Sequence, residues 1–223
     1  MSEHRGTDPG HAGRVPYRDP AVAAAYAAGR AGSGMDRREQ EALGEFLDRA
    51  GLSAGARVLD CPAGGGRLAG FLAARRLSVV AADQSVAMLA HAAAALSGAG
   101  LPRRLAAVDA LALPFRDGSF DLVLCHRLIH HLETEAERRD LLRSLAEATR
   151  KWVLLSWFDA ASLQHIRRAM RRPFRPSRRH AVTRSVLLRD AAAAGLAPVA
   201  FRALRPWISE VSFVLLERGT LSR

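Results

Sequence analysis

A short apolar run that ends in a carboxylate and passes into three consecutive glycines constrains this chain more than any other feature. The run spans 57–60 and ends at Asp60, the glycines are Gly64 to Gly66, and residues 67–75 are apolar at helical spacing. This order predicts a buried strand, a tight turn and a helix. Glycine lets the backbone approach a ligand that a Cβ would exclude, and a helix start presents unpaired N–H groups. We therefore expect a binding site at the carboxyl end of this strand.

Two later apolar stretches are also followed or preceded by an aspartate. The run at 77–82 leads to Asp83, about 20 residues beyond the first strand, where a carboxylate can accept hydrogen bonds from both hydroxyls of a ribose. Ser85 follows as the expected N-cap of the next helix. Asp109 then precedes Leu113-Pro114-Phe115, and a further apolar run occupies 120–126.

Together these segments resemble the class I S-adenosylmethionine-dependent methyltransferases, and within them a small bacterial, type 11-like branch. The resemblance covers roughly residues 40 to 157. One position departs from it: Pro62 stands where the family's first loop glycine usually occurs, and proline removes one backbone N–H. The matching pieces, in order, are Leu59-Asp60 with Gly64 and Gly66, Asp83-Gln84-Ser85 with Met88-Leu89, Asp109-Ala110 with Leu113-Pro114-Phe115, Phe120-Asp121-Leu122-Val123 and His130-His131-Leu132.

The resemblance implies S-adenosylmethionine as the cofactor and assigns its contacts. Asp83 would bind the ribose hydroxyls, and Asp109 would accept a hydrogen bond from the adenine amino group. From the residues alone, Asp83 also fits a solvated turn aspartate, Met88 a plain core contact and Asp109 a turn cap. The set expected at the cofactor is Asp60, Ala63, Gly64, Gly66, Asp83, Gln84, Met88, Asp109, Ala110, Leu111 and His126.

Histidines follow the fourth expected strand. His131, at the family's recurrent histidine, would orient the methyl acceptor or remove its proton, because imidazole titrates near neutrality. A structural hydrogen-bonding role fits His131 equally. His126 and His130 lie four residues apart, but no third ligand occurs at a comparable spacing, so we expect no metal site. Substrate contacts are expected from Tyr26, Arg30, His130, Arg171 and Arg175.

The alternation of strands and helices predicts an α/β fold, namely a Rossmann-like, doubly wound, seven-stranded and mostly parallel sheet with helices on both faces. Residues 21–223 would form one methyltransferase domain, with cover helices in 21–50, after a disordered segment at 1–20. The short connection at 205–207 predicts a hairpin, so the last strand should be antiparallel. Strands are expected at 58–60, 79–83, 104–107, 120–126, 152–157, 199–204 and 208–217.

The formal charge of +11 raises the question of nucleic-acid binding. All basic residues except Lys151 are arginine, which with the abundant alanine indicates a bias in coding composition. The Pro-Pro-Tyr element that marks nucleic-acid methyltransferases after the fourth strand is absent, and Cys125-His126-Arg127-Leu128 stands there instead. We therefore expect a small-molecule acceptor, acidic or lipid-like. One alternative, favoured by Pro62, is a methyltransferase-like protein that binds the cofactor without transferring a methyl group. The other, based on the basic stretch, is a nucleic-acid methyltransferase.

No apolar run approaches the roughly 20 residues needed to span a bilayer, and residues 1–14 are polar, so the sequence predicts a cytoplasmic protein. The insertion at 158–183 is the other distinctive feature. Most of it lies within the stretch 167–184, which contains eight arginines and no acidic residue. Leu163, Ile166 and Met170, at the start of the insertion, form one apolar stripe at helical spacing. Three interpretations stay open: a solvated basic lid, a site for an acidic or phosphorylated acceptor, and a peripheral contact with anionic lipid through 160–172.

Overall fold

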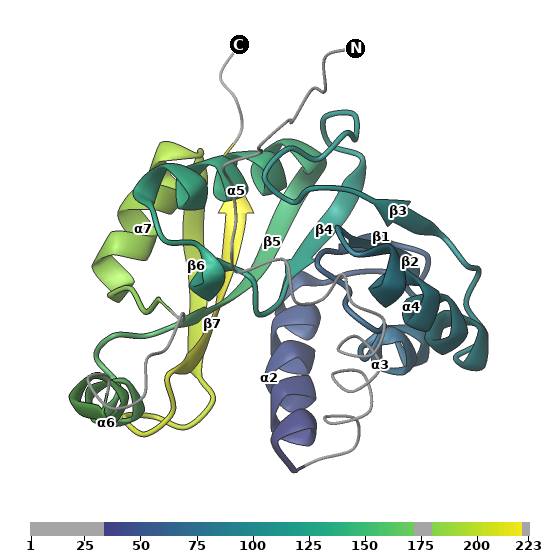
Figure 1. The fold of residues 1–223 in the computed structure, drawn as a ribbon. Helices are drawn as coiled ribbons and strands as arrows, with labels where there is room; N and C mark the ends of the chain where they lie inside the picture. Colours follow the sequence, from purple (N-terminus) through teal and green to yellow (C-terminus); the bar gives the residue numbers. More distant parts are fainter. Residues whose placement is uncertain (1–33, 172–179, 220–223) are drawn as a thin grey trace, which may run out of the picture.

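A computed structural model describes residues 34–171 and 180–219. Within these two segments seven strands form one sheet in the order β3-β2-β1-β4-β5-β7-β6 (Figure 1). β1 to β5 pair in parallel, whereas β7 lies between β5 and β6 and is antiparallel to both. The expected mixed sheet is therefore confirmed. The strands are β1 (Arg57–Asp60), β2 (Ser78–Asp83), β3 (Leu105–Ala107), β4 (Phe120–Cys125), β5 (Thr149–Phe158), β6 (Leu196–Ala203) and β7 (Val211–Arg218).

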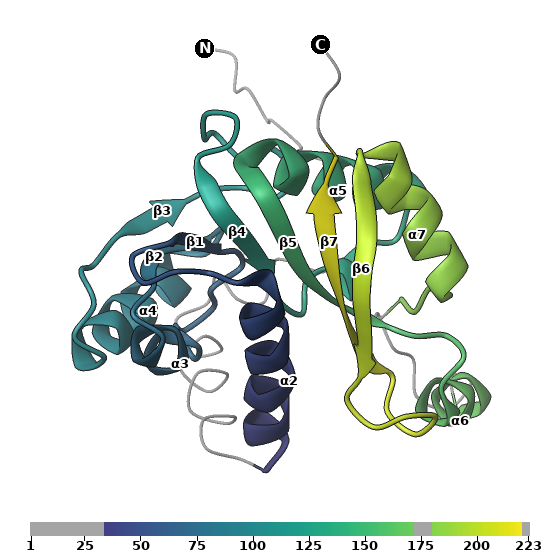
Figure 2. The same ribbon diagram turned by 180° about the vertical axis from the view of Figure 1, so that it is seen from behind.

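Helices cover both faces of the sheet, as Figures 1 and 2 show from opposite sides. One face carries α2 (Gly34–Ala50), α3 (Ala69–Ala74) and α4 (Val86–Gly98), and the other carries α5 (Glu135–Ala148) and α7 (Arg184–Ala193). A short 3-10 helix, η2 (Ile129–His131), follows β4, and α6 (Leu163–Arg171) stands apart beyond the carboxyl end of β5. None of the helices in the described segments is long and apolar enough to cross a bilayer.

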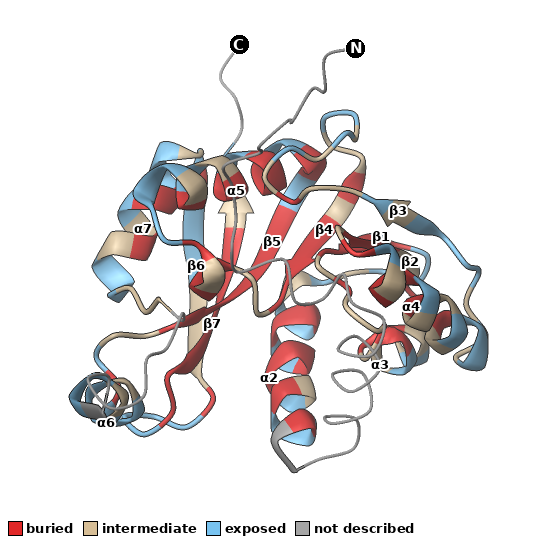
Figure 3. Cartoon of the chain, in the orientation of Figure 1, coloured by how far each residue is buried: buried red, intermediate tan, exposed pale blue. Residues whose placement is uncertain are grey.

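The period-two alternation of each strand divides the core into two layers. On β4, Leu122 and Leu124 face the layer under α2, α3 and α4, whereas Val123 and Cys125 face the layer under α5 and α7. Because side chains of successive strand residues point to opposite faces, a central strand buried on both sides must be apolar throughout. This explains the continuous apolar runs of the sequence, and Figure 3 shows the central strands almost wholly buried.

Side-chain caps start the helices where the sequence predicts. The Ser85 hydroxyl accepts a hydrogen bond from Met88 N at 3.2 Å, which caps α4. Thr134 and Glu137 form a reciprocal capping box at the start of α5. Each cap satisfies N–H groups that have no partner inside the helix. The expected N-cap Ser85 is therefore confirmed.

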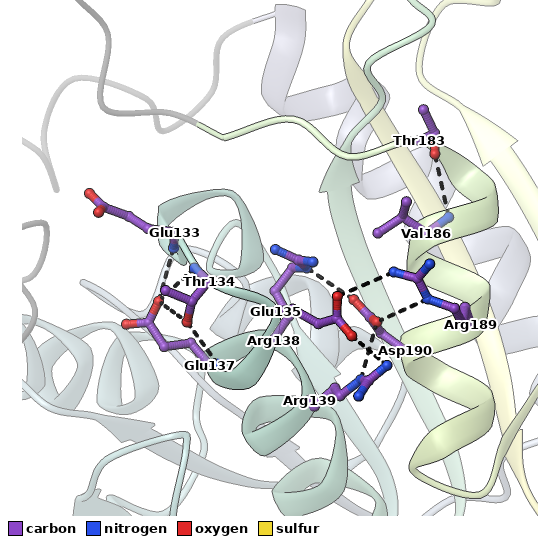
Figure 4. A network of polar contacts seen from close by, with 10 residues as sticks. All are labelled: Glu133, Thr134, Glu135, Glu137, Arg138, Arg139, Thr183, Val186, Arg189 and Asp190. Carbon is purple, nitrogen blue, oxygen red and sulfur yellow. Dashed lines mark hydrogen bonds and ion pairs between the residues drawn. The ribbon is translucent and has the colours of Figure 1, made fainter.

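A polar network fastens α5 to α7 on the second face of the sheet (Figure 4). Asp190 of α7 is fully buried, and its Oδ2 accepts a hydrogen bond from Arg138 Nε at 3.0 Å. Arg139 Nε and Arg189 Nε lie 3.5 and 3.9 Å from its other oxygen. A buried carboxylate requires such counter-charges, because desolvation of an unpaired ion is costly.

Several element boundaries differ from the sequence expectation. Strand β5 begins at Thr149 instead of residue 152, and β6 begins at Leu196 instead of residue 199. The helix after the glycines begins at Ala69 instead of residue 67, because Gly64 and Gly66 adopt positive φ values of 53° and 76° and the intervening backbone makes turns. The last strand begins at Val211 instead of residue 208, because residues 205–208 close a loop in which Ile208 N donates to Pro206 O at 2.8 Å.

Several expectations fall outside the described residues. They are the disorder at 1–20, the first cover helix, Tyr26, Arg30 and Arg175. The side chain of Arg171 is likewise not described. The division into a disordered terminus, cover helices and one domain stays a prediction.

Candidate functional site

A cavity of about 500 Å³ opens at the carboxyl ends of β1, β2 and β4. Every residue that the resemblance assigns to the cofactor lines it except Leu111. Parallel strands bring their carboxyl ends to one edge of the sheet, which is why residues up to 66 positions apart in the chain meet there. Leu111 packs instead against the core layer under α5 and α7, and its N–H donates to Asp109 Oδ1 at 3.0 Å. Asp109 therefore caps a turn as well as lining the cavity.

Asp83 ties the glycine loop to the end of β2. Its Oδ2 accepts a hydrogen bond from Gly64 N at 2.9 Å, and its Oδ1 accepts one from Ser85 N at 2.8 Å. The side chain is buried, so it is not a solvated turn aspartate. Burial raises the pKa of the Asp83 carboxyl, and the backbone N–H groups act against that rise. The Gln84 backbone N–H also contributes, and the carboxylate still has acceptor capacity for a ligand, because its two oxygens offer about four lone-pair sites.

Asp60, at the end of β1, is the most desolvated acid that lines the cavity. It is 3% exposed, and no residue of the described segments donates a hydrogen bond to its carboxylate. Burial raises the pKa of Asp60 to about 7; the charge of Arg67 lowers it and the charge of Asp83 raises it further. A buried carboxylate that faces a cavity in this way suits a ligand that brings a positive charge.

Gly64 and Gly66 are required in the loop for two different reasons. A Cβ on Gly66 would lie 2.8 Å from Ala92 Cα and 2.8 Å from Ala95 Cβ, so this glycine permits close packing on α4. A Cβ on Gly64 would meet no atom within 4 Å, so there the positive φ and the open cavity are what matter. Pro62, the departure from the family pattern, also lines the cavity and follows a cis peptide bond.

His126 lies in the cavity wall, but its ring is held by the protein on both sides. Its Nδ1 lies 3.0 Å from Ser156 Oγ and its Nε2 lies 3.2 Å from Glu39 Oε2. Because the ionised Glu39 carboxylate can only accept, the ring donates from Nε2 to Glu39, and the neutral ring then accepts at Nδ1 from the Ser156 hydroxyl. The same hydroxyl accepts from Arg127 N at 2.8 Å. Burial lowers the pKa of His126 to about 4, so this imidazole is neutral near pH 7.

Glu39 connects the cover helix α2 to the cavity. Its carboxylate is 2% exposed and forms ion pairs with Arg67 Nη2 at 3.0 Å and Arg127 Nη1 at 2.8 Å. Asp36, one turn earlier, also pairs with Arg67. Burial alone would raise the pKa of Glu39, but the hydrogen bond from His126 and the nearby positive charges lower it to about 2.

Sequence reasoning missed this group of Asp36, Glu39, Arg67, Arg127 and Ser156. The missed residues lie on four segments, namely α2, the glycine loop, β5 and the turn after β4, and Glu39 and His126 are 87 positions apart. Only the charge pattern of α2 hinted at them, since Asp36 and Glu39 share one helical face, and that pattern fits a solvated face equally well.

The two histidines of η2 have different surroundings. His131 lines the cavity. His130 is not among the lining residues; its ring stacks on Phe158 with centroids 3.8 Å apart, and its carbonyl accepts a hydrogen bond from His180 N at 2.7 Å. The structure thus places His131, and not His130, where a ligand in this cavity would meet it. The role of each stays a prediction.

Comparison with known proteins bears on the same part of the chain. Residues 58–151, which contain the glycine loop, Asp83, Asp109 and His131, match a family model described as a methyltransferase domain. The sheet order and the antiparallel β7 agree with the solved class I methyltransferases described below. The chain has the class I methyltransferase fold. S-adenosylmethionine is the cofactor that goes with such a domain, as the resemblance implied.

One curated relative and several solved structures are similar to this methyltransferase domain. A candidate methyltransferase of Encephalitozoon cuniculi is 37% identical over 107 residues, which is 47% of this chain and 46% of that protein, so the chain spans about half the length of the relative. Since that organism is not a bacterium, the bacterial branch stays a prediction.

The solved structures share the fold at low identity. Magnesium protoporphyrin IX methyltransferase of Synechocystis, crystallised with bound S-adenosylhomocysteine, superposes with a TM-score of 0.73 at 16% identity, over 92% of this chain and 97% of that one. A candidate methyltransferase of Bacillus halodurans gives 0.63 at 18% identity, over 80% and 99%. The [4+2]-cyclase SpnF gives 0.63 at 15% identity, over 81% of each chain. The last of these carries a different name, which shows why the fold alone does not define a reaction.

Proposed function

We propose that this chain transfers the methyl group of S-adenosylmethionine to a small-molecule acceptor of acidic or lipid-like character. The observation that carries the proposal is the pair of buried carboxylates, Asp60 and Asp83, which end neighbouring strands and line one cavity. A ligand with an ammonium group at one end and a ribose diol at the other can satisfy both of them. S-adenosylmethionine has these two groups.

Asp60 would bind the ammonium group of the methionine portion. In the free protein much of this carboxyl is protonated near pH 7, because its pKa is about 7. A cation beside it favours the charged form, so cofactor binding should release a proton. Gly64 allows the backbone of the loop to approach the ligand closely, since no side chain stands there.

Asp83 would accept hydrogen bonds from the ribose hydroxyls with the acceptor capacity that the backbone N–H groups of Gly64, Gln84 and Ser85 leave unused. Gln84 and Met88 would flank the adenine, and Asp109 with Ala110 would lie along its edge. The bound cofactor supplies an already activated methyl group, so the protein has to orient the two reactants and exclude water.

His131 would orient the acceptor or take up its proton. Its ring lies in the cavity wall, 4.2 Å from the ring of His130 between centroids. The neutral His126 is less suited to this task, because Ser156 and Glu39 already occupy both of its ring nitrogens. A cytoplasmic location is part of the same proposal and rests on the sequence alone.

A calorimetric titration with S-adenosylmethionine and S-adenosylhomocysteine tests the proposal. Asp83→Asn keeps the shape of the side chain but removes its charge, and should weaken binding by about 1.5–3 kcal/mol, the range for hydrogen bonds to a charged group. Asp117→Asn is the matched control, because that carboxylate is exposed and pairs with Arg218 away from the cavity. Equal affinity of the Asp83 variant and the wild type would contradict the assignment.

The second candidate is a cofactor-binding protein that transfers no methyl group. Pro62 favours it, since the loop that approaches the methionine portion carries proline where the family usually has glycine. Labelled S-adenosylmethionine incubated with cell extract distinguishes the two. Methyl transfer to a small molecule, lost in Asp83→Asn, supports the enzyme, whereas tight binding without transfer supports the second candidate.

A further inference from the structure

Helix α6 turns its apolar stripe away from the protein. Leu163, Ile166 and Met170 recur at helical spacing, and they are 49%, 46% and 72% exposed. An amphipathic helix of a water-soluble domain ordinarily buries this stripe against the core. Figure 3 shows α6 in the colours of exposed and intermediate residues, in contrast to the buried central strands.

The opposite, polar face of α6 makes the contacts with the rest of the domain. Arg168 Nη1 forms an ion pair with Glu210 Oε2 at 2.6 Å, and Gln164 Oε1 accepts a hydrogen bond from Glu210 N at 3.2 Å. Glu210 is 2% exposed, and the Arg168 guanidinium lies 5.5 Å from the centroid of the Phe158 ring. The orientation of the helix is therefore set by buried polar contacts, and a simple rotation that buried the stripe would break them.

The loop between β6 and β7 extends the same surface. Leu163 N donates to Trp207 O at 2.9 Å and Gln164 N donates to Ile208 O at 3.1 Å, so the loop is hydrogen-bonded to the start of α6. Trp207 is 81% exposed and Ile208 is 54% exposed. We call Leu163, Ile166, Met170, Trp207 and Ile208 the apolar ridge. It holds five of the eight large apolar residues that are exposed in the described segments.

The charge around the apolar ridge is positive. Arg167 follows Ile166 on the exposed side of α6, and Arg205 precedes Trp207 in the loop; both are exposed. The sequence from 167 to 184 contains eight arginines, Arg167 among them, and no acidic residue. Of the acids beside α6 in the described segments, Glu210 is buried and paired with Arg168, and Asp159, ahead of the helix, is half-buried.

We propose that the apolar ridge docks on an anionic lipid surface. Apolar side chains that include an exposed tryptophan, flanked by arginines, match the two properties of that surface: an apolar boundary below charged headgroups, and a negative potential. A second copy of this chain fits less well, because it would bring the same positive charge against itself. This proposal concerns membrane attachment and not the reaction, so its test is independent of the proposed methyl transfer.

The apolar ridge lies at the same edge of the sheet as the cavity. The apolar ridge and the cavity both lie beyond the carboxyl ends of the parallel strands, and α6 and α2 stand at this same edge of the sheet in Figures 1 and 2. A protein docked through α6 would hold that edge toward the bilayer, which suits a lipid-like acceptor.

Vesicle co-sedimentation of the full chain tests the proposal, with phosphatidylcholine vesicles that contain or lack phosphatidylglycerol. The wild type should bind the anionic vesicles, and the triple change Ile166→Ser, Met170→Ser and Trp207→Ser should reduce the partition coefficient at least about tenfold, because apolar burial drives interfacial binding. Val199→Ser is the matched control, since Val199 is an exposed apolar residue on β6 outside the ridge.

The charge is tested in the same assay. Arg167→Ser and Arg205→Ser should each lower binding to anionic vesicles by about fivefold, the effect of one basic residue near such a surface. Arg143→Ser controls for net charge, because that arginine lies on α5 and is 62% exposed. Circular dichroism and thermal unfolding establish that all variants fold.

The fluorescence of Trp207 provides an independent test of membrane insertion. The other two tryptophans, Trp152 and Trp157, are 8% and 2% exposed, so a blue shift of the emission on adding anionic vesicles would report insertion of Trp207. Trp207→Phe should keep binding and lose the shift. Failure of the wild type to bind anionic vesicles, equal binding by the triple variant, or a dimer in light scattering that the triple variant abolishes would each overturn the proposal.

Discussion

The buried carboxyl of Asp60 should make this protein less stable as the pH rises, and Asp60→Asn should remove that loss. The pKa of Asp60 is about 7 in the folded protein, against an ordinary value of 3.8. The folded state therefore holds a proton that the unfolded state has released, so stability is greatest below the unfolded pKa and falls as the pH rises through the folded one. Over this range of about three pH units the loss amounts to up to about 4 kcal/mol.

Urea unfolding of the wild type and of Asp60→Asn at about pH 4.5 and about pH 8 measures this effect. The variant should gain stability relative to the wild type as the pH rises, with an unchanged dependence on urea concentration. Asp48→Asn on α2, where the side chain is 76% exposed, is the control for the chemical change without burial. A stability difference between Asp60→Asn and the wild type that is the same at both pH values would refute the reasoning, since the carboxylate would then be ionised without cost.

The same variant connects stability to the proposed cofactor. If an ammonium group binds Asp60, saturating S-adenosylhomocysteine should stabilise the wild type more than Asp60→Asn at high pH, because the ligand then compensates the buried charge. Calorimetry in two buffers of different ionisation enthalpy should also detect uptake of a proton by the buffer on binding to the wild type, and less of it with the variant.

Two further changes test the glycine loop and the cover helix. Gly66→Ala should lower stability by about 1–3 kcal/mol, because its Cβ would overlap α4. Gly64→Ala, with open space around it, should lower stability by about 1 kcal/mol, from its positive φ alone. Equal losses in urea unfolding would contradict the packing argument. Glu39→Gln should lower stability by about 3 kcal/mol near pH 7, because the pKa of Glu39 is lowered from 4.5 to about 2 in the folded protein. The difference from the wild type should shrink as the pH falls from 4.5 toward 2, because the charge of Glu39 stabilises the fold only above that range. A difference independent of pH would show that the ion pairs contribute nothing.

The sequence by itself determined the local parts of this site. The strand, turn and helix around Asp60, the aspartate that ends β2 and the caps Ser85 and Thr134 all depend on residues within a few positions of one another. Strand and helix periods, glycine conformation and capping are short-range properties, so a linear pattern can reveal them. The order of the parallel strands then follows from the family pattern, and it brings these local pieces to one edge.

Only the tertiary structure decided which distant charges meet. Glu39 reaches His126 across 87 positions and Arg127 across 88, and nothing in the sequence around α2 distinguishes a buried acid from a solvated one. The same holds for α6. Its period shows an apolar stripe, but a period does not say which face contacts the protein. Glu210, which directly precedes β7, is buried and pairs with Arg168, so the polar face of α6 contacts the protein and the apolar ridge stays exposed. An unpaired buried carboxylate would cost more free energy than exposed apolar side chains do.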